Sequence, residues 1–305
     1  MKFIFFSPHT FTSYQRIPPR MSKKQTSRVS NRNTELINLN DYDLSRVFFD
    51  NVVENELQQG NKTIKYYKVQ LGSRNQSGIG EFVFEIPFFA HSFGVEEFQN
   101  EQGKATNYSV SLSLVDSNNP QEEQTQLVEK FGELIEKIKD HVLSIKKEIK
   151  KPTLDRTELK KFNPMYQSLD EDGNPKGDAW YFAPKLMTRK NYNREDGKEN
   201  PNANDFDMKI ETKFYVDGQF DAKGEPIEIS PLEFVGKKHF KFMGSVKIDT
   251  IYIGSKISLQ CKVYDGVVQT VENKRKRLVR IGAQPSQSAQ QDSDLLLVGD
   301  EEEDE

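Results

Sequence analysis

Lysine and aromatic residues alternate in the tract KTIKYYK, residues 62–68. Successive side chains of an extended strand point to opposite faces, so Lys62, Tyr66 and Lys68 would share one face and Lys65 would lie on the other. A surface that binds single-stranded nucleic acid needs cations to hold the phosphates and aromatic rings to stack on unpaired bases. The tract therefore indicates such a surface, although for any single ring a place in the protein core is the favoured interpretation.

A second group of aromatic residues is followed closely by basic residues, within a long stretch that is otherwise polar. Its members are Trp180, Tyr181, Lys185, Arg189 and Lys190. We predict that this group lies at the mouth of a loop over residues 170–207, because binding residues concentrate on loops. A role for Trp180 as a core residue is an equal alternative.

The segment over residues 239–271 alternates apolar and polar residues and predicts two strands, joined by a turn or bulge at Ile253-Gly254-Ser255. Lys241 lies in the first strand, and Tyr252 and Lys256 flank the turn. The complete set of candidate nucleic-acid-binding residues is Lys62, Lys65, Tyr66, Lys68, Trp180, Tyr181, Lys185, Arg189, Lys190, Lys241, Tyr252 and Lys256.

The remaining periodicity predicts a mainly β fold with one long helix. β-Branched and aromatic residues between turn residues predict strands over residues 44–53, 62–71, 81–87, 107–115 and 208–216. Apolar residues at three- and four-residue steps predict a helix that Asn119 caps and Pro152 ends. An OB-fold-like antiparallel barrel, a fold that binds oligonucleotides, would produce this order of elements.

The chain ends in DSDLLLVGDEEEDE, which holds eight of the 47 acidic residues and no basic one. The preceding 291 residues have 43 basic residues against 39 acidic ones, a net charge of +4. We therefore predict a disordered polar arm over residues 1–40, one domain over residues 41–282 and a disordered acidic tail over residues 283–305. Met21 resembles a natural start, and we hypothesise that residues 1–20 are dispensable.

Residue types that catalysis or metal binding would require are sparse. The four histidines are not spaced as metal ligands around Cys261, and no phosphate-binding loop of the Gly-x-x-x-x-Gly-Lys type occurs. The segment Lys262-Val263-Tyr264-Asp265-Gly266 resembles the lysine motif of nucleotidyltransferases but has one residue too many between the lysine and the aspartate, and we interpret Asp265-Gly266 as a turn. We expect no enzyme, no cofactor and no metal. A single cysteine and the lack of a long apolar run predict an intracellular, reducing location and no membrane contact.

Two tracts resemble a known family. The segment at residues 232–269, with Ile251-Tyr252-Ile253-Gly254-Ser255-Lys256-Ile257 inside it, and the earlier AWYFAPKL at residues 179–186, resemble the single-stranded DNA-binding proteins of large nucleocytoplasmic DNA viruses. That family is related to the replication single-stranded DNA-binding protein of short-tailed coliphages.

The resemblance implies an OB-fold, DNA binding without sequence preference during viral replication or recombination, and a role for the acidic tail. In such proteins the tail occupies the DNA groove and recruits replication proteins when DNA displaces it. The residues that would do so here are Leu295, Leu296, Leu297, Asp300, Glu301, Glu302, Glu303, Asp304 and Glu305. The chain departs from the coliphage type because it ends in glutamate rather than in an aromatic residue.

A protein-interaction scaffold or histone-chaperone-like factor is the alternative, in which the tail binds basic proteins and the body binds no DNA. For the DNA-binding prediction, the expected partners are single-stranded DNA and, through the acidic tail, replication proteins. Homo-oligomerisation stays open, and so does the choice between the host nucleus and a viral replication site.

Overall fold

The computed structural model describes residues 28–59, 62–116, 119–159, 162–192, 206–236 and 238–270. The chain divides into two units, Met1–Val271 and Glu272–Glu305, and every described residue belongs to the first. The hypothesis about residues 1–20 and the predictions for the acidic tail therefore fall outside the described residues. The predicted arm has a structured end, because Leu36–Ile37 forms a strand and the side chain of Leu39 is fully buried.

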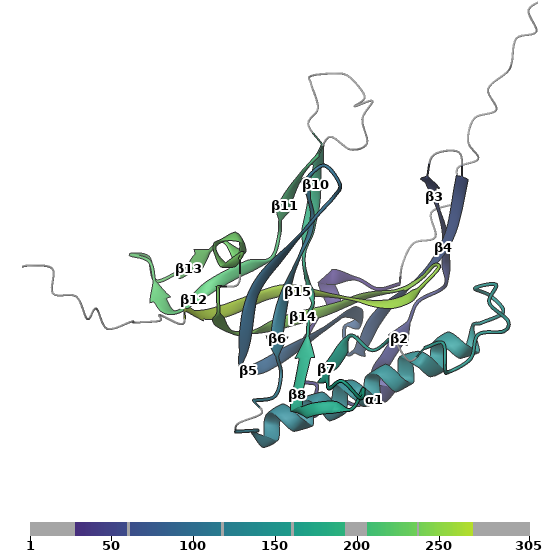
Figure 1. Cartoon of the computed structure of the whole chain (residues 1–305), viewed down its shortest axis with the longest axis horizontal. Coiled ribbons are helices and arrows are strands. Elements are labelled where there is room, and N and C mark those ends of the chain that lie inside the picture. Colours follow the sequence, from purple (N-terminus) through teal and green to yellow (C-terminus); the bar gives the residue numbers. More distant parts are fainter. Residues whose placement is uncertain are drawn as a thin grey trace, which may run out of the picture. The chain divides into compact units, whose positions relative to one another are not determined.

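The described residues are mainly β, as the sequence predicts, with one long helix (Figure 1). The strands are β1 (Leu36–Ile37), β2 (Val47–Phe49), β3 (Val53–Gln59), β4 (Lys62–Asn75), β5 (Gly78–Gln99), β6 (Ala105–Ser113), β7 (Met165–Leu169), β8 (Pro175–Phe182), β9 (Lys185–Leu186), β10 (Thr188–Tyr192), β11 (Phe206–Ile210), β12 (Lys213–Phe220), β13 (Pro226–Ile229), β14 (Phe240–Ile253) and β15 (Ile257–Thr270). The helices are α1 (Glu122–Ser144) and the short 3₁₀ turns η1 (Asn31–Asn33), η2 (Leu44–Arg46) and η4 (Pro231–Phe234).

Strand β14 is the centre of the main sheet, which has 13 strands among the described residues. It pairs with β15 along one edge, and with β4 and β5 along the other. The pairing continues from β15 to β9, from β9 to β6, from β6 to β5, and so returns to β14. The strands therefore hydrogen-bond in a ring, which gives the sheet an inner and an outer side.

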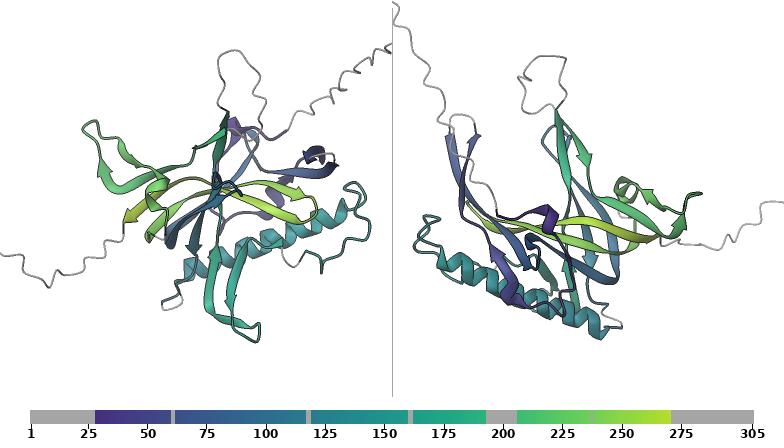
Figure 2. Two further views of the ribbon diagram at one scale, coloured as in Figure 1. Left: turned by 45° about the horizontal axis from the view of Figure 1, so that its top comes forward. Right: turned by 180° about the vertical axis from the view of Figure 1, so that it is seen from behind.

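Helix α1 lies across one side of this sheet (Figures 1 and 2). Its apolar stripe is buried, as the three- and four-residue spacing predicts. The ring of Phe131 packs against those of Phe84 on β5 and Phe182 on β8, at centroid distances of 5.1 and 5.4 Å. The helix and the inner sides of the strands thus form one continuous core.

The start of α1 differs from the prediction. The helix begins at Glu122 with Gln121 as N-cap, and Asn119 and Pro120 precede it. The side-chain oxygen of Gln124 accepts hydrogen bonds from the backbone N–H groups of Gln121, at 3.3 Å, and of Asp116, at 3.1 Å. This glutamine therefore ties the helix start to the segment that follows β6.

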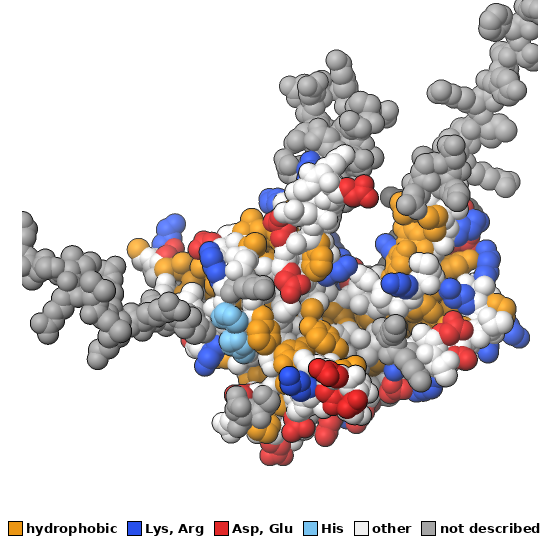
Figure 3. Space-filling view, in the orientation of Figure 1, with side chains coloured by type: hydrophobic (Ala, Val, Ile, Leu, Met, Phe, Trp, Pro, Cys, Tyr) orange, Lys and Arg blue, Asp and Glu red, His pale blue; other side chains and the backbone are white. Residues whose placement is uncertain are grey.

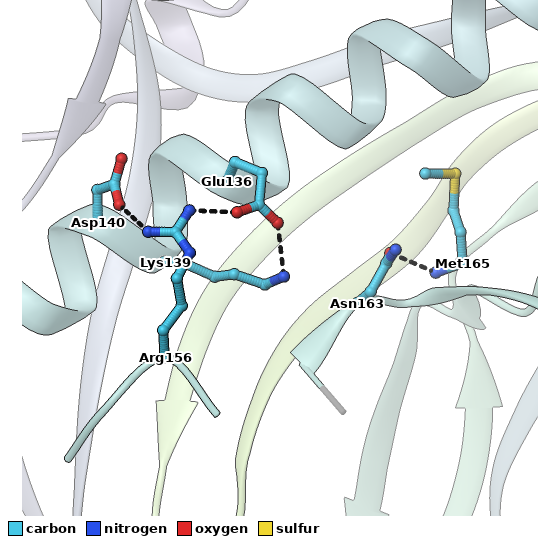
Figure 4. A network of polar contacts seen from close by, with 6 residues as sticks. All are labelled: Glu136, Lys139, Asp140, Arg156, Asn163 and Met165. Carbon is cyan, nitrogen blue, oxygen red and sulfur yellow. Dashed lines mark hydrogen bonds and ion pairs between the residues drawn. The ribbon is translucent and has the colours of Figure 1, made fainter. Parts of the chain in front are cut away.

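Ion pairs, in addition to backbone hydrogen bonds of successive turns, connect the segment after α1 to the helix. The guanidinium of Arg156 binds Glu136 and Asp140, one turn apart on α1, and Lys139 also binds Glu136 at 2.6 Å (Figure 4). Regular helix ends at Ser144, earlier than Pro152 would require, and turns continue to Lys150.

The stretch predicted as a long polar loop contains hairpin strands instead. Residues 165–182 form β7 and β8, so that Trp180 and Tyr181 lie within a strand. The single strand predicted over residues 208–216 is broken between β11 and β12 at Glu211-Thr212. The hydroxyl of Thr212 donates to the backbone oxygen of Val263 at 2.7 Å, and this buried contact holds the break against β15.

Asp265-Gly266 is not a turn but an internal part of β15. Gly266 pairs directly with Gly244 of β14, and a Cβ atom on either glycine would collide with the ring of Phe242. The two glycines therefore make room for a large core side chain. The strand pair predicted over residues 239–271 is confirmed, with its turn at residues 254–256.

Two β-bulges change which residues of β14 and β15 face the core. Register shifts occur at Tyr264 and at Asp249, where one strand has one residue more than its partner. Before Asp249 the even-numbered residues Phe242 and Ile248 are buried, and after it the odd-numbered Ile251 is buried. An extra residue in a strand re-aims the side chains that follow it. The bulge at Asp249 thus turns Tyr252 to the outer side.

Four charged side chains surround this bulge. Lys247 binds Glu81 at 2.7 Å and Asp249 at 3.3 Å, and Lys262 binds Asp249 at 2.8 Å. Burial alone would raise the pKa of Asp249, but the hydrogen bond from Lys262 and the two lysine charges outweigh it and hold this pKa below its usual value. The carboxylate therefore stays ionised and bridges neighbouring strands.

We predict that Asp249→Asn lowers the free energy of unfolding by about 1–3 kcal/mol at pH 7, because two partly buried lysines lose a charged partner. A carboxyl group whose pKa is lowered by folding stabilises the fold at pH values above its pKa in the unfolded chain. This stabilisation is lost as the pH falls through the pKa of the folded protein. The difference between the wild type and the variant should therefore shrink in acid. Urea unfolding at several pH values measures it.

The control is Glu228→Gln, which removes the ion pair with Lys213 between two half-exposed side chains. It should change the free energy of unfolding by no more than about 0.5 kcal/mol. An equal effect of the two substitutions would show that the charges at the bulge do not stabilise it.

Candidate nucleic-acid interface

A row of paired residues crosses four strands on the outer side of the sheet. Val53 of β3 pairs with Lys68 of β4, Lys68 with Tyr252 of β14, and Tyr252 with Ser258 of β15. The neighbours Tyr67, Val69 and Ile251 are buried in the core, so strand alternation directs the row outward. We call this surface, with its flanking residues named below, the tyrosine–lysine face.

The aromatic part of the face consists of two tyrosines from strands far apart in sequence. The rings of Tyr66 and Tyr252 lie 5.2 Å apart with an interplanar angle of 32°. The ammonium group of Lys68 lies 5.6 Å from the centre of the Tyr66 ring. Next to them, Leu57 and Ile64 pair across β3 and β4 and are both exposed. Apolar and aromatic surface thus adjoins a cation in the way that base stacking beside a phosphate requires.

The polar part of the face continues over β15 and β9. Lys185 of β9 pairs with Lys262, and its ammonium group lies 3.5 Å from the side-chain oxygen of Gln260. Within the described ranges Lys68 and Lys185 have no carboxylate partner, whereas Lys262 is paired with Asp249. Two cations of the face are thus free to bind an anion.

Carboxylates of the same hairpin lie on the opposite side. Glu54 binds Lys65 and Lys150, each at 2.9 Å, and Glu56 binds Lys65 at 3.3 Å. The hydrogen bonds from Lys65 and Lys150 hold the pKa of Glu54 at about 2. Lys65, although predicted to contact nucleic acid, is therefore held on the other side of β4 from Tyr66. Strand alternation thus separates the acidic residues from the tyrosine–lysine face.

Figure 3 shows hydrophobic side chains, with basic ones beside them, over β3 and β4, next to a hollow. In the same view, Figure 1 shows on the other side of this hollow the tip of the β5–β6 hairpin and, next to it, the β10–β11 hairpin. In this hairpin Arg189 is paired directly with Lys209, and both side chains are exposed. Like charges in directly opposed positions repel each other. The hairpin therefore adds a second cationic site. It consists of the predicted Arg189 and of Lys209, which the sequence reasoning missed.

The structure brings together four predicted residues, Tyr66, Lys68, Lys185 and Tyr252, and places Lys256 on the turn beside them. Strand β4 includes Lys62 and β10 includes Lys190, but their side chains fall outside the described part. Trp180 is not part of the tyrosine–lysine face, because its side chain points toward α1. Lys241 and Tyr181 belong to a different row.

That row contains aromatic residues from several strands. Its ring-to-ring contacts run from His239 to His91, Phe93, Tyr181 and Tyr166, with centroid distances between 5.1 and 5.9 Å. Phe93 and Tyr166 are 38% and 50% exposed. Apart from Tyr181, none of these rings is among the predicted nucleic-acid-binding residues. They come together only through the register of β5, β6, β7 and β8.

The two histidines of this row share one hydrogen bond. Nε2 of His91 lies 3.2 Å from Nδ1 of His239. Burial, followed by the charges of His239 and Lys241, lowers the pKa of His91, while Asp116 acts in the opposite direction. A second positive charge is thus disfavoured at this position.

We predict that Lys241→Gln raises the pKa of His91, because it removes one of the two positive charges that disfavour protonation. A depressed histidine pKa also makes the fold lose stability as the pH falls below about 6.5, since the unfolded chain binds the proton more readily. NMR titration of the imidazole protons measures the pKa of His91 in the wild type and in the variant. The pKa of His141, which burial lowers at a distant place in the fold, should not move; a shift of both histidines would contradict a local effect.

A family model matches residues 54–305, which is most of the chain. The chain belongs to the family DUF2738. This family is described as "protein of unknown function", and no curated protein matches the chain. The DUF2738 match begins within β3 and includes every residue of the tyrosine–lysine face except Val53.

Two further findings concern the described part of this DUF2738 chain. No helix there is both long and apolar enough to cross a membrane. No group of three or more His, Cys, Asp or Glu side chains is placed there to hold a metal ion. The thiol of Cys261 is buried, and burial raises its pKa, so it is protonated at neutral pH.

Proposed function

We propose that this protein binds single-stranded DNA without sequence preference and does so on the tyrosine–lysine face. The observation that carries the proposal is the direct pairing of Lys68 with Tyr252, next to Tyr66 and within a face that holds a second free cation, Lys185. Stacking on an aromatic ring stabilises binding by about 1–3 kcal/mol per base and is tolerant of sequence, because every base has a flat face.

The ring of hydrogen-bonded strands with one long helix packed against it supports an OB-fold-like barrel as the fold. On this proposal the face is the outer surface of such a barrel. The viral resemblance supports the same function, because the tract at residues 251–257 forms the β14–β15 turn that carries Tyr252 and Lys256. The biological role would be the coating of single strands during viral replication or recombination.

Two substitutions test the face. Tyr252→Ala should weaken binding to a labelled 30-nucleotide oligo(dT) by about 5- to 100-fold through lost stacking. Lys68→Gln should reduce the slope of log K against log salt by about 0.7, because one phosphate contact is lost from a single strand. Fluorescence anisotropy over a series of salt concentrations measures both quantities.

The matched control is Lys65→Gln, on the same strand but on the opposite side and already ion-paired. It should leave the salt slope unchanged. Equal losses for Lys65→Gln and Lys68→Gln would indicate a diffuse charge effect and contradict the face. No binding by the wild type at low salt would overturn the function itself and favour the alternative of a protein-interaction scaffold.

We propose further that the acidic tail competes with DNA for these cations. A tethered polyanion has a high effective concentration at a cationic surface. Replacing Asp300, Glu301, Glu302, Glu303, Asp304 and Glu305 by their amides should therefore tighten oligo(dT) binding at low salt, and the gain should decrease as salt screens the competition. The same anisotropy titration measures it; unchanged affinity at every salt concentration would contradict competition.

A further inference from the structure

A cavity of about 520 Å³ lies between the N-terminal half of α1 and the β7–β8 hairpin. Its walls are mostly apolar and include Val115, Val128, Met165 and Trp180. Trp180 and Tyr181 are consecutive on β8, so they point to opposite sides, and Trp180 faces the helix. A cavity of this size with a few polar groups is typical of a binding site.

The helix leaves this space open through a glycine. Gly132 lies in the interior of α1 and lines the cavity, and a Cβ atom added to it would meet no atom within 4 Å. Glycine disfavours the helix relative to every residue except proline. The fold therefore tolerates a poor helix former at a position where a larger side chain would extend into the cavity.

The charges around the cavity are almost all negative. Glu129 and Asp178 line it and are exposed, and among the described residues that line it there is no lysine, arginine or histidine. Over residues 119–133 and 162–182, which supply nearly all the lining, there are eight acidic residues and two basic ones. One of these two, Lys130, is paired with Glu133 at 2.8 Å. An anion such as nucleic acid is thus repelled.

We propose that this cavity binds an apolar, positively charged segment of a partner protein. Apolar side chains of the segment would occupy the space beside Gly132 and Met165, and its lysine or arginine side chains would contact Glu129 and Asp178. A cation over the face of Trp180 gains a further attraction from the ring electrons. The site is independent of the proposed DNA-binding function, because it lies between α1 and the β7–β8 hairpin, whereas the tyrosine–lysine face lies over β3, β4, β14, β15 and β9. The two sites also have opposite charge.

Trp180 is the single tryptophan of the chain, so its fluorescence reports directly on the cavity. The full-length protein is titrated with the peptide KLFKLLKK, with KSGKSSKK, which keeps the charge but lacks apolar residues, and with the charge-reversed ELFELLEE. We expect a saturable change in emission with the first peptide and at least tenfold weaker responses with the other two. An equal response to KSGKSSKK, which would reflect only attraction to the acidic tail and surface, overturns the proposal.

Two variants locate the effect. Gly132→Leu should fill the cavity, weaken KLFKLLKK binding at least tenfold, and raise the thermal unfolding temperature, because leucine favours the helix. Should this variant unfold, the exposed pair Glu129→Gln with Asp178→Asn provides the test, with binding weakened severalfold and no loss of fold. Unchanged binding in a folded variant of either kind contradicts the site. Oligo(dT) binding, measured in parallel, should be unaffected by both.

Discussion

The position of Tyr252 depends on one extra residue, Asp249. The even-numbered residues of β14 face the core up to Ile248, and without the bulge Tyr252 would follow them inward. The bulge is stabilised by Lys247 and Lys262, which bind the Asp249 carboxylate from two directions. The outer aromatic surface is therefore coupled to a partly buried charge network. The same step returns Ile251 and Ile253 to the core, where each is fully buried.

Strand alternation then sorts the charges of the β3–β4 hairpin. Inward residues such as Tyr67 and Val69 must be buried, and this requirement fixes Tyr66 and Lys68 on the outer side. It also places Glu54 on the side of Lys65 and Lys150, away from Tyr66 and Tyr252. The 291 residues that precede the acidic end have a net charge of only +4. The fold can in this way present free cations on one surface, while the region around α1 and the β7–β8 hairpin carries an excess of acids. The two surfaces are suited to ligands of opposite charge.

The sequence predicted the β-rich fold and the apolar stripe of α1, because both depend on local periodicity. It also predicted the β14–β15 turn, and that Tyr66, Lys68 and Tyr252 each lie in a strand, but not that these three residues lie together. Alternation alone could not reveal the bulge at Asp249, since a bulge is defined by the register of two strands. The same limit explains why Trp180 was placed in a loop, and why Phe93, Tyr166 and Lys209 were not recognised. Their neighbours come from strands that are distant in sequence.

The central claim is that single-stranded DNA contacts the tyrosine–lysine face. Photochemical cross-linking of the full-length protein to an oligonucleotide that contains 5-bromodeoxyuridine, followed by mass spectrometry of the peptides, tests it most directly. The account predicts cross-links at Tyr66 and Tyr252, which disappear when unlabelled oligo(dT) is added in excess. Cross-links confined to other parts of the chain, such as α1 or the β7–β8 hairpin, would contradict it.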